Sequence, residues 1–387
     1  MDPHLPVVAH SVNPYLPRSG SWIYSQICTL RRYRAIVITK RLENPEYFPF
    51  TPVFARSQLW LPNQLYQRFG RRWLYGYFPF HRTAVVRQRA RLLHSHFGDR
   101  ACADVSLKQA VGIPQVSSFY GADVWKLSRD AEWLDRYRVL FEAGECFLVE
   151  GNAMRDKVIA MGCAPEKVRV HHLGVDLAQI PFAPRQPEGD GEVRFLIAGR
   201  AIEKKGHDLA IQAFERVRRR YAKARLGIMI IARGRHEERT LAQLREKIRA
   251  SGVEESVTLY GFQPYAQYLE ALRRYHIFLA PSVHAADGDA EGGAPVTIIE
   301  MCASGMPVIG SAHCDIPEVL GHGASGVLVP EGDVEALAEA MARLLAEPKS
   351  WLAYARAGRA HIDAQYNVRH QGPALEDTYD ELLGVAA

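Results

Sequence analysis

A glycine-rich loop flanked by two carboxylates occupies residues 291–300. It comprises Glu291, Gly292, Gly293, Ala294, Pro295 and, after a short apolar run, Glu300. The glycines and the proline predict a loop that leads into a helix, and free N–H groups at a helix start favour a phosphate. A carboxylate inside that helix, Glu300, can accept hydrogen bonds from sugar hydroxyls. The stretch therefore predicts a site for a diphosphate that carries a ribose.

A second group of candidate residues follows the apolar run 193–198. Gly199 and Arg200 come directly after this run, and Lys205 precedes a helical pattern. Arginine offers a planar fork and lysine a point charge, so the two side chains can converge on one diphosphate. Basic residues in loops are commonly only solvated. The presence of the glycine-rich loop at 291–300 in the same chain favours a phosphate-binding role for this pair.

Two aspartates, Asp287 and Asp289, lie just before the first glutamate. Two carboxylates can hold a divalent ion against a diphosphate. Acidic residues in a glycine-rich loop are commonly solvated, however, and Arg200 with Lys205 already supplies positive charge. We therefore expect neither a metal ion nor any other cofactor.

The elements that must position these residues alternate along the chain. At 387 residues the chain exceeds one typical core and fits two domains. Apolar runs alternate with helical patterns, which predicts parallel sheets with helices on both faces. We expect a first domain at 1–180, a linker rich in proline and glycine at 181–192, a second domain at 193–366 and a terminal helix within 367–387.

Cysteine usage and hydropathy indicate a compartment. The six cysteines are scattered without a C-x-x-C pair, which is typical of reduced thiols rather than of disulfides or a zinc site. No apolar run approaches the roughly 18 residues of a membrane span, and no signal-peptide pattern opens the chain. We expect a cytoplasmic protein, with the inner face of the cell membrane as a further location.

Positive charge is concentrated in residues 1–100, which hold 15 Lys and Arg against 4 Asp and Glu. Aromatic residues are interleaved with this charge at 66–78. Such a surface suits peripheral contact with an anionic membrane. Nucleic acid is a competing partner, but no nucleic-acid motif accompanies the charge and the acidic remainder of the chain opposes a polyanion. A solvated basic face with partly buried aromatics remains a third interpretation.

Together these motifs resemble family 4 of the retaining nucleotide-sugar glycosyltransferases, which have the GT-B fold. That family carries a glutamate, a glycine, a proline and a second glutamate, followed by Ala-Ser-Gly-x-Pro-Val. Glu291, Gly292, Pro295, Glu300 and residues 303–308 match this pattern, and Gly199, Arg200 and Lys205 match the family's Gly-Arg…Lys-Gly element. The loop between the two glutamates is one residue longer here than is usual in the family.

Two further segments are similar to family segments in the first domain. Residues 94–98 match a His-x-His-Phe-Gly strand end, which contains His96. Residues 120–123 match a His-Gly-x-Asp turn with Tyr120 in the place of the histidine and Asp123 at its end. A tyrosine can hydrogen-bond a sugar hydroxyl but is a poor base at its ordinary pKa. The resemblance implies that these residues border the acceptor and that Gly20 lies near the donor phosphates.

The resemblance implies an α/β fold of the GT-B type, with two Rossmann-like domains facing across a cleft and a C-terminal helix crossing back to the first. It implies transfer of a hexosyl group from a UDP- or GDP-sugar to a hydroxyl with retention of configuration. Arg200 and Lys205 would stabilise the leaving diphosphate, Glu291 would hold the transferred sugar and Glu300 the ribose. Front-face attack within an ion pair requires no nucleophile. The acceptor would be a saccharide or a polyprenyl- or other lipid-linked glycan of surface polysaccharide or glycolipid synthesis.

Two other functions fit the same fold. One is a degenerate, non-catalytic protein that binds a nucleotide sugar or a glycan, and the departures at Tyr120 and in the glutamate spacing are compatible with it. The other is an epimerase or a phosphorylase of the GT-B fold. Turnover with release of a free nucleotide distinguishes a transferase from both.

Overall fold

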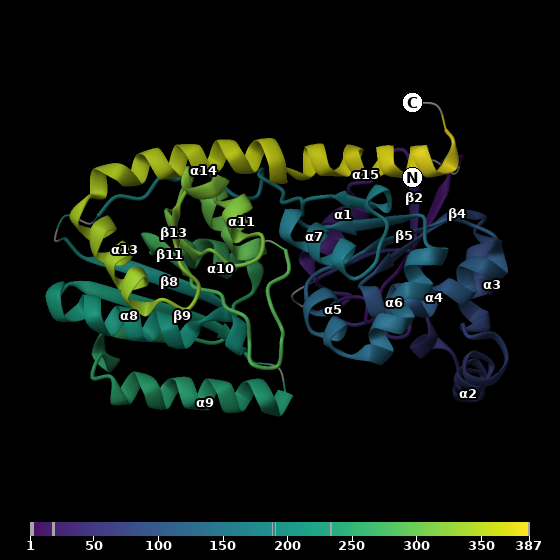
Figure 1. Ribbon diagram of the computed structural model, residues 1–387, viewed down its shortest axis with the longest axis horizontal. Coiled ribbons are helices and arrows are strands. Elements are labelled where there is room, and N and C mark those ends of the chain that lie inside the picture. The colour runs from purple at the N-terminus through teal and green to yellow at the C-terminus, as the bar shows by residue number, and fades with distance from the viewer. Residues whose placement is uncertain are drawn as a thin grey trace. The chain divides into compact units, whose positions relative to one another are not determined.

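Two compact α/β units make up the chain (Figure 1). The computed structural model describes residues 4–17, 20–187, 189, 191–232, 234–293 and 295–385. One unit comprises Met1–Val175 with Val368–Ala387, and the other comprises Asp176–Asn367. Each contains one sheet, of seven strands in the first unit and six in the second. The expected pair of Rossmann-like domains with parallel sheets is confirmed.

The first sheet has the strand order β3-β2-β1-β4-β5-β6-β7, and its neighbours pair in parallel. Its strands are β1 (Val7–Ser11), β2 (Arg34–Thr39), β3 (Val53–Ala55), β4 (Ala90–His96), β5 (Gln115–Ser118), β6 (Cys146–Val149) and β7 (Val168–Val170). Its helices are α1 (Ser21–Cys28), α2 (Leu61–Phe69), α3 (Pro79–Arg87), α4 (Gly98–Val111), α5 (Ala122–Trp125), α6 (Ala131–Ala143), α7 (Asn152–Ala160) and α15 (Val368–Leu383). A π-helical turn, Gly70–Tyr75, continues α2.

Both faces of this sheet are buried, as the alternation of side chains along β1 shows. Val7 and Ala9 pack in a cluster with residues of α3 and α4. Val8, between them, packs on the other face with Leu375 and Tyr379 of α15. Successive side chains of a strand point to opposite faces, so one short apolar strand serves two layers of helices.

Polar contacts join α15 to the loop before β2. The Glu376 carboxylate accepts hydrogen bonds from the backbone N–H groups of Arg31 and Arg32, both at 2.6 Å. The Tyr33 hydroxyl donates to Asp380 at 2.5 Å. The last helix of the chain therefore completes the first unit, although residues 176–367 separate the two in sequence.

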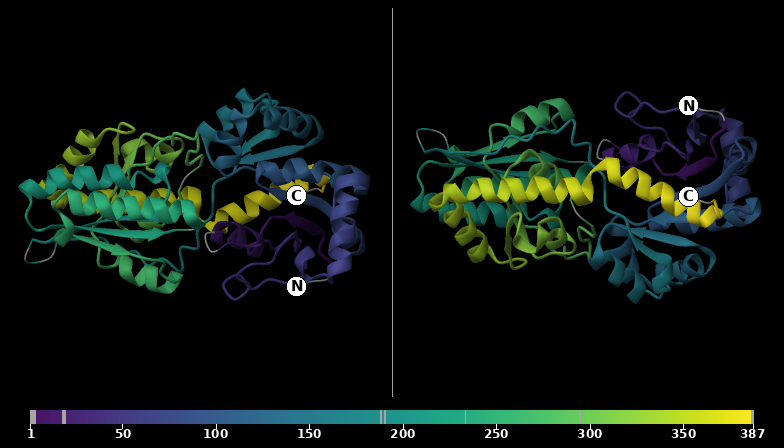
Figure 2. Two further views of the ribbon diagram at one scale, coloured as in Figure 1. Left: turned by 90° about the horizontal axis from the view of Figure 1, so that it is seen from below. Right: turned by 90° about the horizontal axis from the view of Figure 1, so that it is seen from above.

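The second sheet has the order β10-β9-β8-β11-β12-β13, and its neighbours also pair in parallel. Its strands are β8 (Val193–Arg200), β9 (Ala224–Ile231), β10 (Val257–Tyr260), β11 (Ile277–Ala280), β12 (Val308–Ser311) and β13 (Val327–Val329). Its helices are α8 (His207–Arg220), α9 (Gly234–Ala250), α10 (Tyr265–Leu272), α11 (Val296–Ser304), α12 (Ile316–Val319), α13 (Val334–Ala346) and α14 (Trp351–Tyr366). Helices lie on both sides of the strands (Figure 2).

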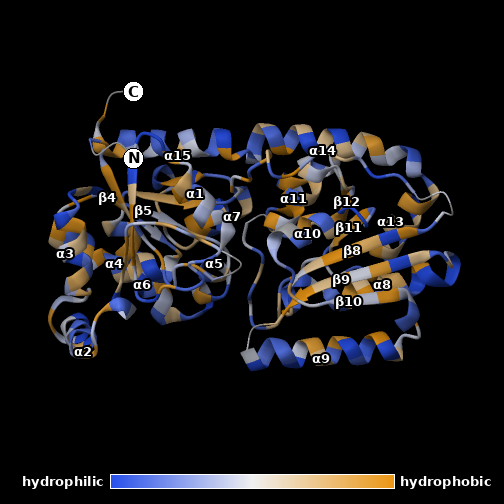
Figure 3. Cartoon of the chain, turned by 180° about the vertical axis from the view of Figure 1, so that it is seen from behind, coloured by the Kyte–Doolittle hydropathy of each residue, from blue (hydrophilic) through white to orange (hydrophobic). Residues whose placement is uncertain are grey.

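The core of the second unit is built on β8 and β9, which are largely hydrophobic (Figure 3). Phe195 of β8 and Ile228 of β9 are fully buried against Phe214 of α8 and Met341 of α13. The segment expected as a linker also packs in this unit, where the buried Arg185 donates to the carbonyl oxygens of Tyr275 (3.0 Å) and Ser304 (3.1 Å).

A close backbone contact joins the loop after β8 to the end of β11. Gly206 precedes α8 in a left-handed conformation, with φ of 66°. A Cβ atom at this position would lie 1.9 Å from the carbonyl oxygen of Pro281. Only glycine satisfies both conditions without displacing the loop that follows β11.

Elements that the alternation did not predict lie between β2 and β4, namely β3, α2 and α3. Among the described residues, no helix is both long and apolar enough to cross a bilayer. The six cysteines carry free thiols.

Replacing Glu376 by alanine should lower the free energy of unfolding by about 2 kcal/mol or more, because two backbone N–H groups lose their acceptor. Asp377→Ala is the matched control. Asp377 is exposed and forms a surface ion pair with Arg32, so its loss should cost less than about 1 kcal/mol. Urea denaturation of the two variants measures the difference, and equal losses would contradict the role given to Glu376.

Gly206→Ala should destabilise the protein by clearly more than Gly252→Ala. Gly252 has a similar φ of 69°, but a Cβ atom there meets nothing within 4 Å. The Gly252 variant therefore measures the conformational cost alone, about 1 to 2 kcal/mol. Any excess in the Gly206 variant reports the clash with Pro281. Similar thermal midpoints for the two variants would show that the loop yields without cost.

Candidate active site

The carboxyl ends of three neighbouring strands bring the predicted residues of the second unit together. β8, β11 and β12 are adjacent and parallel, so the loops that follow them emerge at one edge. Ligands bind at this edge in open α/β sheets. The loops supply residues 201–206, 281–293 and 312–315, which lie far apart in sequence.

Glu291 and Lys205 form a buried ion pair at this edge. The Lys205 Nζ atom lies 2.8 Å from Glu291 Oε2, and the Ser282 hydroxyl donates to Oε1 at 2.7 Å. Glu291 is 8% exposed. Burial alone would raise its pKa, but Lys205, Lys204 and the hydrogen bonds outweigh burial, so the pKa is lowered. Glu291 is therefore an ionised carboxylate whose position is set by two neighbouring loops.

A buried histidine orients the backbone of Glu291. His313 Nε2 accepts a hydrogen bond from the Glu291 N–H at 3.2 Å, and His313 Nδ1 lies 2.9 Å from Glu331 Oε2. An accepting Nε2 places the proton of a neutral ring on Nδ1, facing the carboxylate. Burial is the largest influence on the pKa of His313, which is lowered. His313, Glu331 and Ser282 were not predicted from sequence, although Ser282 and His313 follow strand ends.

Arg200 is also paired with a carboxylate, in this case Glu237 of α9. Its buried Nε atom has no hydrogen-bond partner among the described residues. Gly199 precedes it, and a Cβ atom there would lie 3.3 Å from the side chain of Lys205. Both predicted phosphate-binding cations thus lie at the strand edge, and a bound diphosphate would share them with Glu237 and Glu291.

The glycine-rich loop leads directly into α11, as the sequence predicted. Gly292 has a φ of 77°, in the left-handed region, Gly293 is buried, and Pro295 is the residue before the first helical position. Ala294, also expected at the donor, lies outside the described residues. Helix α11 begins at Val296, so its N-terminal dipole end follows the loop that carries Glu291.

Glu300 lies in α11 and is held by two tyrosines of α10. The hydroxyls of Tyr265 and Tyr268 donate to its two carboxylate oxygens, each at 3.1 Å. Burial raises the pKa of Glu300 to about 7, and the tyrosine hydrogen bonds oppose this shift. The tyrosines were missed from sequence, although their three-residue spacing places both on one face of a helix.

The three candidate acceptor residues lie in the first unit, at the ends of β4 and β5. His96 is fully buried, with Nε2 3.0 Å from His10 Nδ1 and Nδ1 2.7 Å from the Tyr120 hydroxyl. Burial holds the pKa of His96 well below its usual range. Of the pair His96 and Tyr120, the tyrosine is the half-buried member.

Asp123 organises the backbone around these residues. Its carboxylate accepts hydrogen bonds from three backbone N–H groups, those of Gly98 (2.8 Å), Tyr120 (3.1 Å) and Gly121 (2.8 Å). Burial raises the pKa of Asp123 to about 6 despite these bonds. Gly20 lies before α1 in the same unit, where a Cβ atom would come within 3.0 Å of the Pro17 carbonyl oxygen.

His10, His94 and His96 form a buried cluster that the sequence did not predict. Parallel pairing sets His10 of β1 opposite His94 of β4, and His96 lies two residues further along the same face. One ligand-type atom from each histidine lies within 4.8 Å of the others. His94 is hydrogen-bonded to Tyr379 (2.6 Å) and Ser118 (2.7 Å), and burial lowers the pKa of every member. The cluster is a neutral hydrogen-bonded network beneath Tyr120.

Solved structures share this architecture over almost the whole chain. A structure from Anabaena, described as Alr3699/HepE in complex with UDP, superposes with a TM-score of 0.79 at 16% identity and covers 97% of this chain and 100% of that one. Sucrose-phosphate synthase from Thermosynechococcus elongatus superposes with a TM-score of 0.77 at 15% identity, covering 98% and 100%. At these identities the likeness shows the fold alone, and it confirms the expected GT-B class.

Curated proteins with similar sequences include glycosyltransferases named for the biosynthesis of amylovoran and colanic acid. The amylovoran biosynthesis glycosyltransferase AmsK of Erwinia amylovora is 36% identical over 65% of this chain and 60% of its own length. The putative colanic acid biosynthesis glycosyltransferase WcaL of Escherichia coli is 31% identical over 66% and 61%. The matched regions span about three fifths of these relatives. Residues 181–361, which carry the predicted donor residues of the second unit, match the family described as glycosyl transferases group 1.

Proposed function

We propose that this protein transfers a hexosyl group from a UDP- or GDP-sugar to a hydroxyl of a glycan acceptor, with retention of configuration. The observation that carries the proposal is the buried pair of Lys205 and Glu291 beside the start of α11, with Glu300 on that helix. This arrangement combines a cation, a helix N-terminus and two carboxylates at one sheet edge. Relatives named as glycosyltransferases, and a structural neighbour solved with UDP, support the same activity.

The charges at the edge fit a departing nucleoside diphosphate. Negative charge grows on the diphosphate as its bond to the sugar breaks, and groups placed to meet that charge lower the barrier. Lys205, Arg200 and the N-terminus of α11 are the groups assigned to this task. They are held in place before the donor arrives, so little reorganisation accompanies the reaction.

The two glutamates take different parts in this proposal. Glu291, ionised beside Lys205, accepts hydrogen bonds from hydroxyls of the transferred sugar. Glu300 accepts from the ribose, sharing its oxygens with Tyr265 and Tyr268, because each carboxylate oxygen can accept more than one hydrogen bond. Attack from the face that the nucleotide leaves gives retention without a protein nucleophile, and no metal ion enters the mechanism.

The acceptor in this proposal is a saccharide linked to a polyprenyl or other lipid, at the cytoplasmic face of the membrane. The names of the relatives, which refer to amylovoran and colanic acid biosynthesis, support a role in exopolysaccharide synthesis. The basic and aromatic residues of the first unit support peripheral contact with an anionic bilayer. His96, Tyr120 and Asp123 lie at the ends of β4 and β5, where Tyr120 offers a hydroxyl to the acceptor.

A nucleoside diphosphate should stabilise the protein without a metal ion. At about a hundred times its dissociation constant, a ligand adds about 2.7 kcal/mol to the free energy of unfolding. Thermal denaturation with UDP, GDP, ADP and CMP, each with and without EDTA, should single out UDP or GDP and show no effect of EDTA. The double variant Lys205→Met with Glu291→Gln removes the buried pair together and should lose the stabilisation, whereas Lys349→Met, at an exposed site, should keep it.

Release of the free nucleotide on addition of the acceptor, with an α-linked product from an α-linked donor, would complete the test. Stabilisation without turnover would favour the degenerate binding protein. If none of the four nucleotides stabilised the protein, the proposal that this sheet edge is a donor site would be contradicted.

Nucleotide affinity should rise with pH through the titration of Glu300. With a pKa of about 7, its carboxyl group is protonated below neutrality and is then a weaker acceptor for the ribose. Between about pH 8 and pH 6 the affinity should fall by up to about tenfold, since one pH unit below its pKa a carboxyl is about one tenth ionised. Calorimetric titration of Glu300→Gln is the control, because the diphosphate titrates equally with both proteins. Identical pH profiles would assign the dependence to the nucleotide alone.

A further inference from the structure

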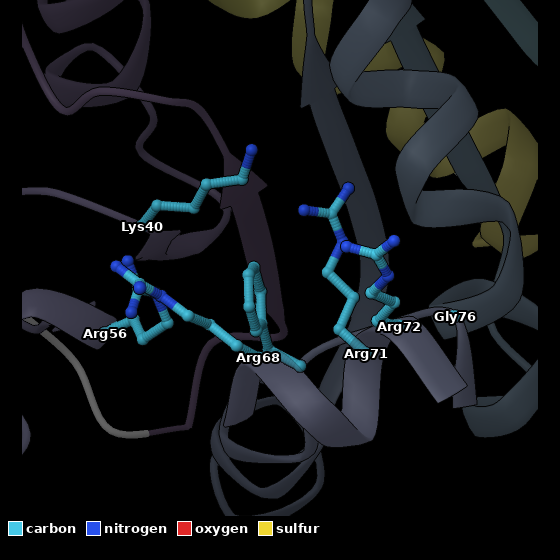
Figure 4. A pocket seen from close by; sticks show the side chains of 7 residues that line it. Lys40, Arg56, Arg68, Arg71, Arg72 and Gly76 are labelled. Carbon is cyan, nitrogen blue, oxygen red and sulfur yellow. The ribbon is translucent and has the colours of Figure 1, made fainter. Parts of the chain in front are cut away.

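A pocket of about 610 Å³ in the first unit is lined by five cationic side chains. They are those of Lys40, Arg56, Arg68, Arg71 and Arg72. The described residues that line it include no carboxylate. Lys40 and Arg56 reach it from one side, and Arg71 and Arg72 from the other (Figure 4). Like charges are gathered here from three separate segments of the chain.

The pocket lies where a parallel sheet binds its ligands. Lys40 is the first residue after β2, and Arg56 is the first after β3. The three remaining arginines come from α2 and from the π-helical turn that continues it. The carboxyl edge of the sheet therefore forms one wall of the pocket and α2 with its π turn forms another.

The positive charge in the pocket is not neutralised locally. Arg56 is 8% exposed, and its buried Nε atom has no hydrogen-bond partner among the described residues. Burial, and then the charges of Arg71 and Arg100, lower the pKa of Lys40. Asp99 and Asp104 act in the opposite direction, but Asp104 is bound to Arg100. Bringing cations together in a partly buried site is unfavourable unless an anion joins them.

Next to the pocket, α2 carries an exposed apolar stripe. Leu61, Leu65, Phe69 and Trp73 recur every four residues and are 67%, 55%, 54% and 67% exposed. This spacing places them along one side of the helix and its π-helical continuation. The buried side is polar, where Gln67 accepts a hydrogen bond from the Phe80 N–H at 2.7 Å. Such an inverted helix is typical of a segment that enters another apolar phase.

We propose that this pocket binds the diphosphate of a lipid-linked acceptor while the stripe on α2 enters the membrane that holds the lipid. The inference rests on the proposed function and adds the site that would bind the diphosphate of its acceptor. Two linked phosphates can be met from both walls of the pocket at once, and guanidinium groups bind phosphate oxygens in pairs. A single phosphate on a bulk phospholipid would leave several of these cations without a partner.

The sheet order makes the pocket compatible with an acceptor at Tyr120. β2 and β5 are separated by β1 and β4, which is three strand spacings, or roughly 14 Å along the edge. Lys40 follows β2 and Tyr120 follows β5, on the same edge. A diphosphate held at Lys40 would thus leave its saccharide to extend along the edge toward Tyr120, within the reach of a short glycan.

Vesicle flotation tests the pocket directly. The full chain is mixed with phosphatidylcholine vesicles of three kinds. The first kind contains a polyprenyl diphosphate, the second contains phosphatidylglycerol at the same surface charge, and the third contains polyprenol, which carries no phosphate. We expect binding to the diphosphate vesicles to exceed binding to the phosphatidylglycerol vesicles by about tenfold or more, because the cations of the pocket meet both phosphates of one headgroup at once. Lys40→Gln with Arg71→Gln should abolish this preference.

Two control variants are needed. One distinguishes a loss of total positive charge from a loss of the pocket, and the other distinguishes the apolar stripe on α2 from exposed apolar residues elsewhere. Arg82→Gln with Arg87→Gln removes the same charge from exposed positions of α3 and should keep the preference. Trp73→Ser with Leu65→Ser should weaken binding to vesicles of every composition, whereas Val139→Ser, at an exposed apolar position of α6, should not.

Equal binding to the two charge-matched vesicles would overturn the proposal in favour of a general anionic surface. An unchanged preference for diphosphate vesicles in the Lys40 and Arg71 variant would also overturn it. A further contrary result would come from the Trp73 and Leu65 variant, if free inorganic diphosphate competed fully for the protein while this variant showed no preference among the vesicles. Nucleotide stabilisation, measured on the same variants, should be unaffected. A failure of the donor site would therefore appear in that assay, and a failure of this pocket only in flotation.

Discussion

The buried ion pair of Lys205 and Glu291 is the interaction on which the carboxyl edge of the second unit depends. Removing two charges from water costs several kcal/mol for each ion, so a buried pair persists only when further hydrogen bonds complete it. The Ser282 hydroxyl supplies such a bond to the Glu291 carboxylate from the loop after β11. His313, which contacts Glu331, accepts a hydrogen bond from the backbone N–H of Glu291 and so joins the loops after β12 and β13 to the same residue. The hydrogen bonds of Glu291 thus connect several loops at the proposed donor site.

The two glutamates of this site show how surroundings give one chemical group two behaviours. Cations close to Glu291 lower its pKa below the ordinary value, whereas burial among neutral tyrosines raises the pKa of Glu300 to about 7. Charge neighbours dominate in the first case and desolvation in the second. One ionised carboxylate, Glu291, and one carboxyl group that titrates near neutrality, Glu300, follow from that difference.

The first unit combines a rigid and an adaptable surface. Its sheet is closed by α15, whose Glu376 and Asp380 bind the loop before β2. Helix α2 of the same unit exposes apolar side chains to solvent. Their exposure to water is unfavourable, and they add nothing to the hydrophobic core. In this arrangement strand ends and α2 line the basic pocket, and α2 also carries exposed apolar side chains.

The sequence alone determined the two parallel α/β domains and the helix start at Pro295, because strand and helix periodicity and turn residues act over a few neighbouring positions. It also placed Gly199 and Arg200 directly after a strand, Lys205 before a helix and Glu291 at the start of the glycine-rich loop. It left β3, α2 and α3 unpredicted, since short edge elements carry little periodicity.

Only the tertiary structure decided the partners of those residues. The pairing of Arg200 with Glu237, the tyrosines at Glu300 and the histidine cluster on β1 and β4 all join segments that are distant in sequence. Sequence position does not specify such partners, because strand order and register choose which ends meet at one edge of a sheet, and burial then decides which charges must be paired there.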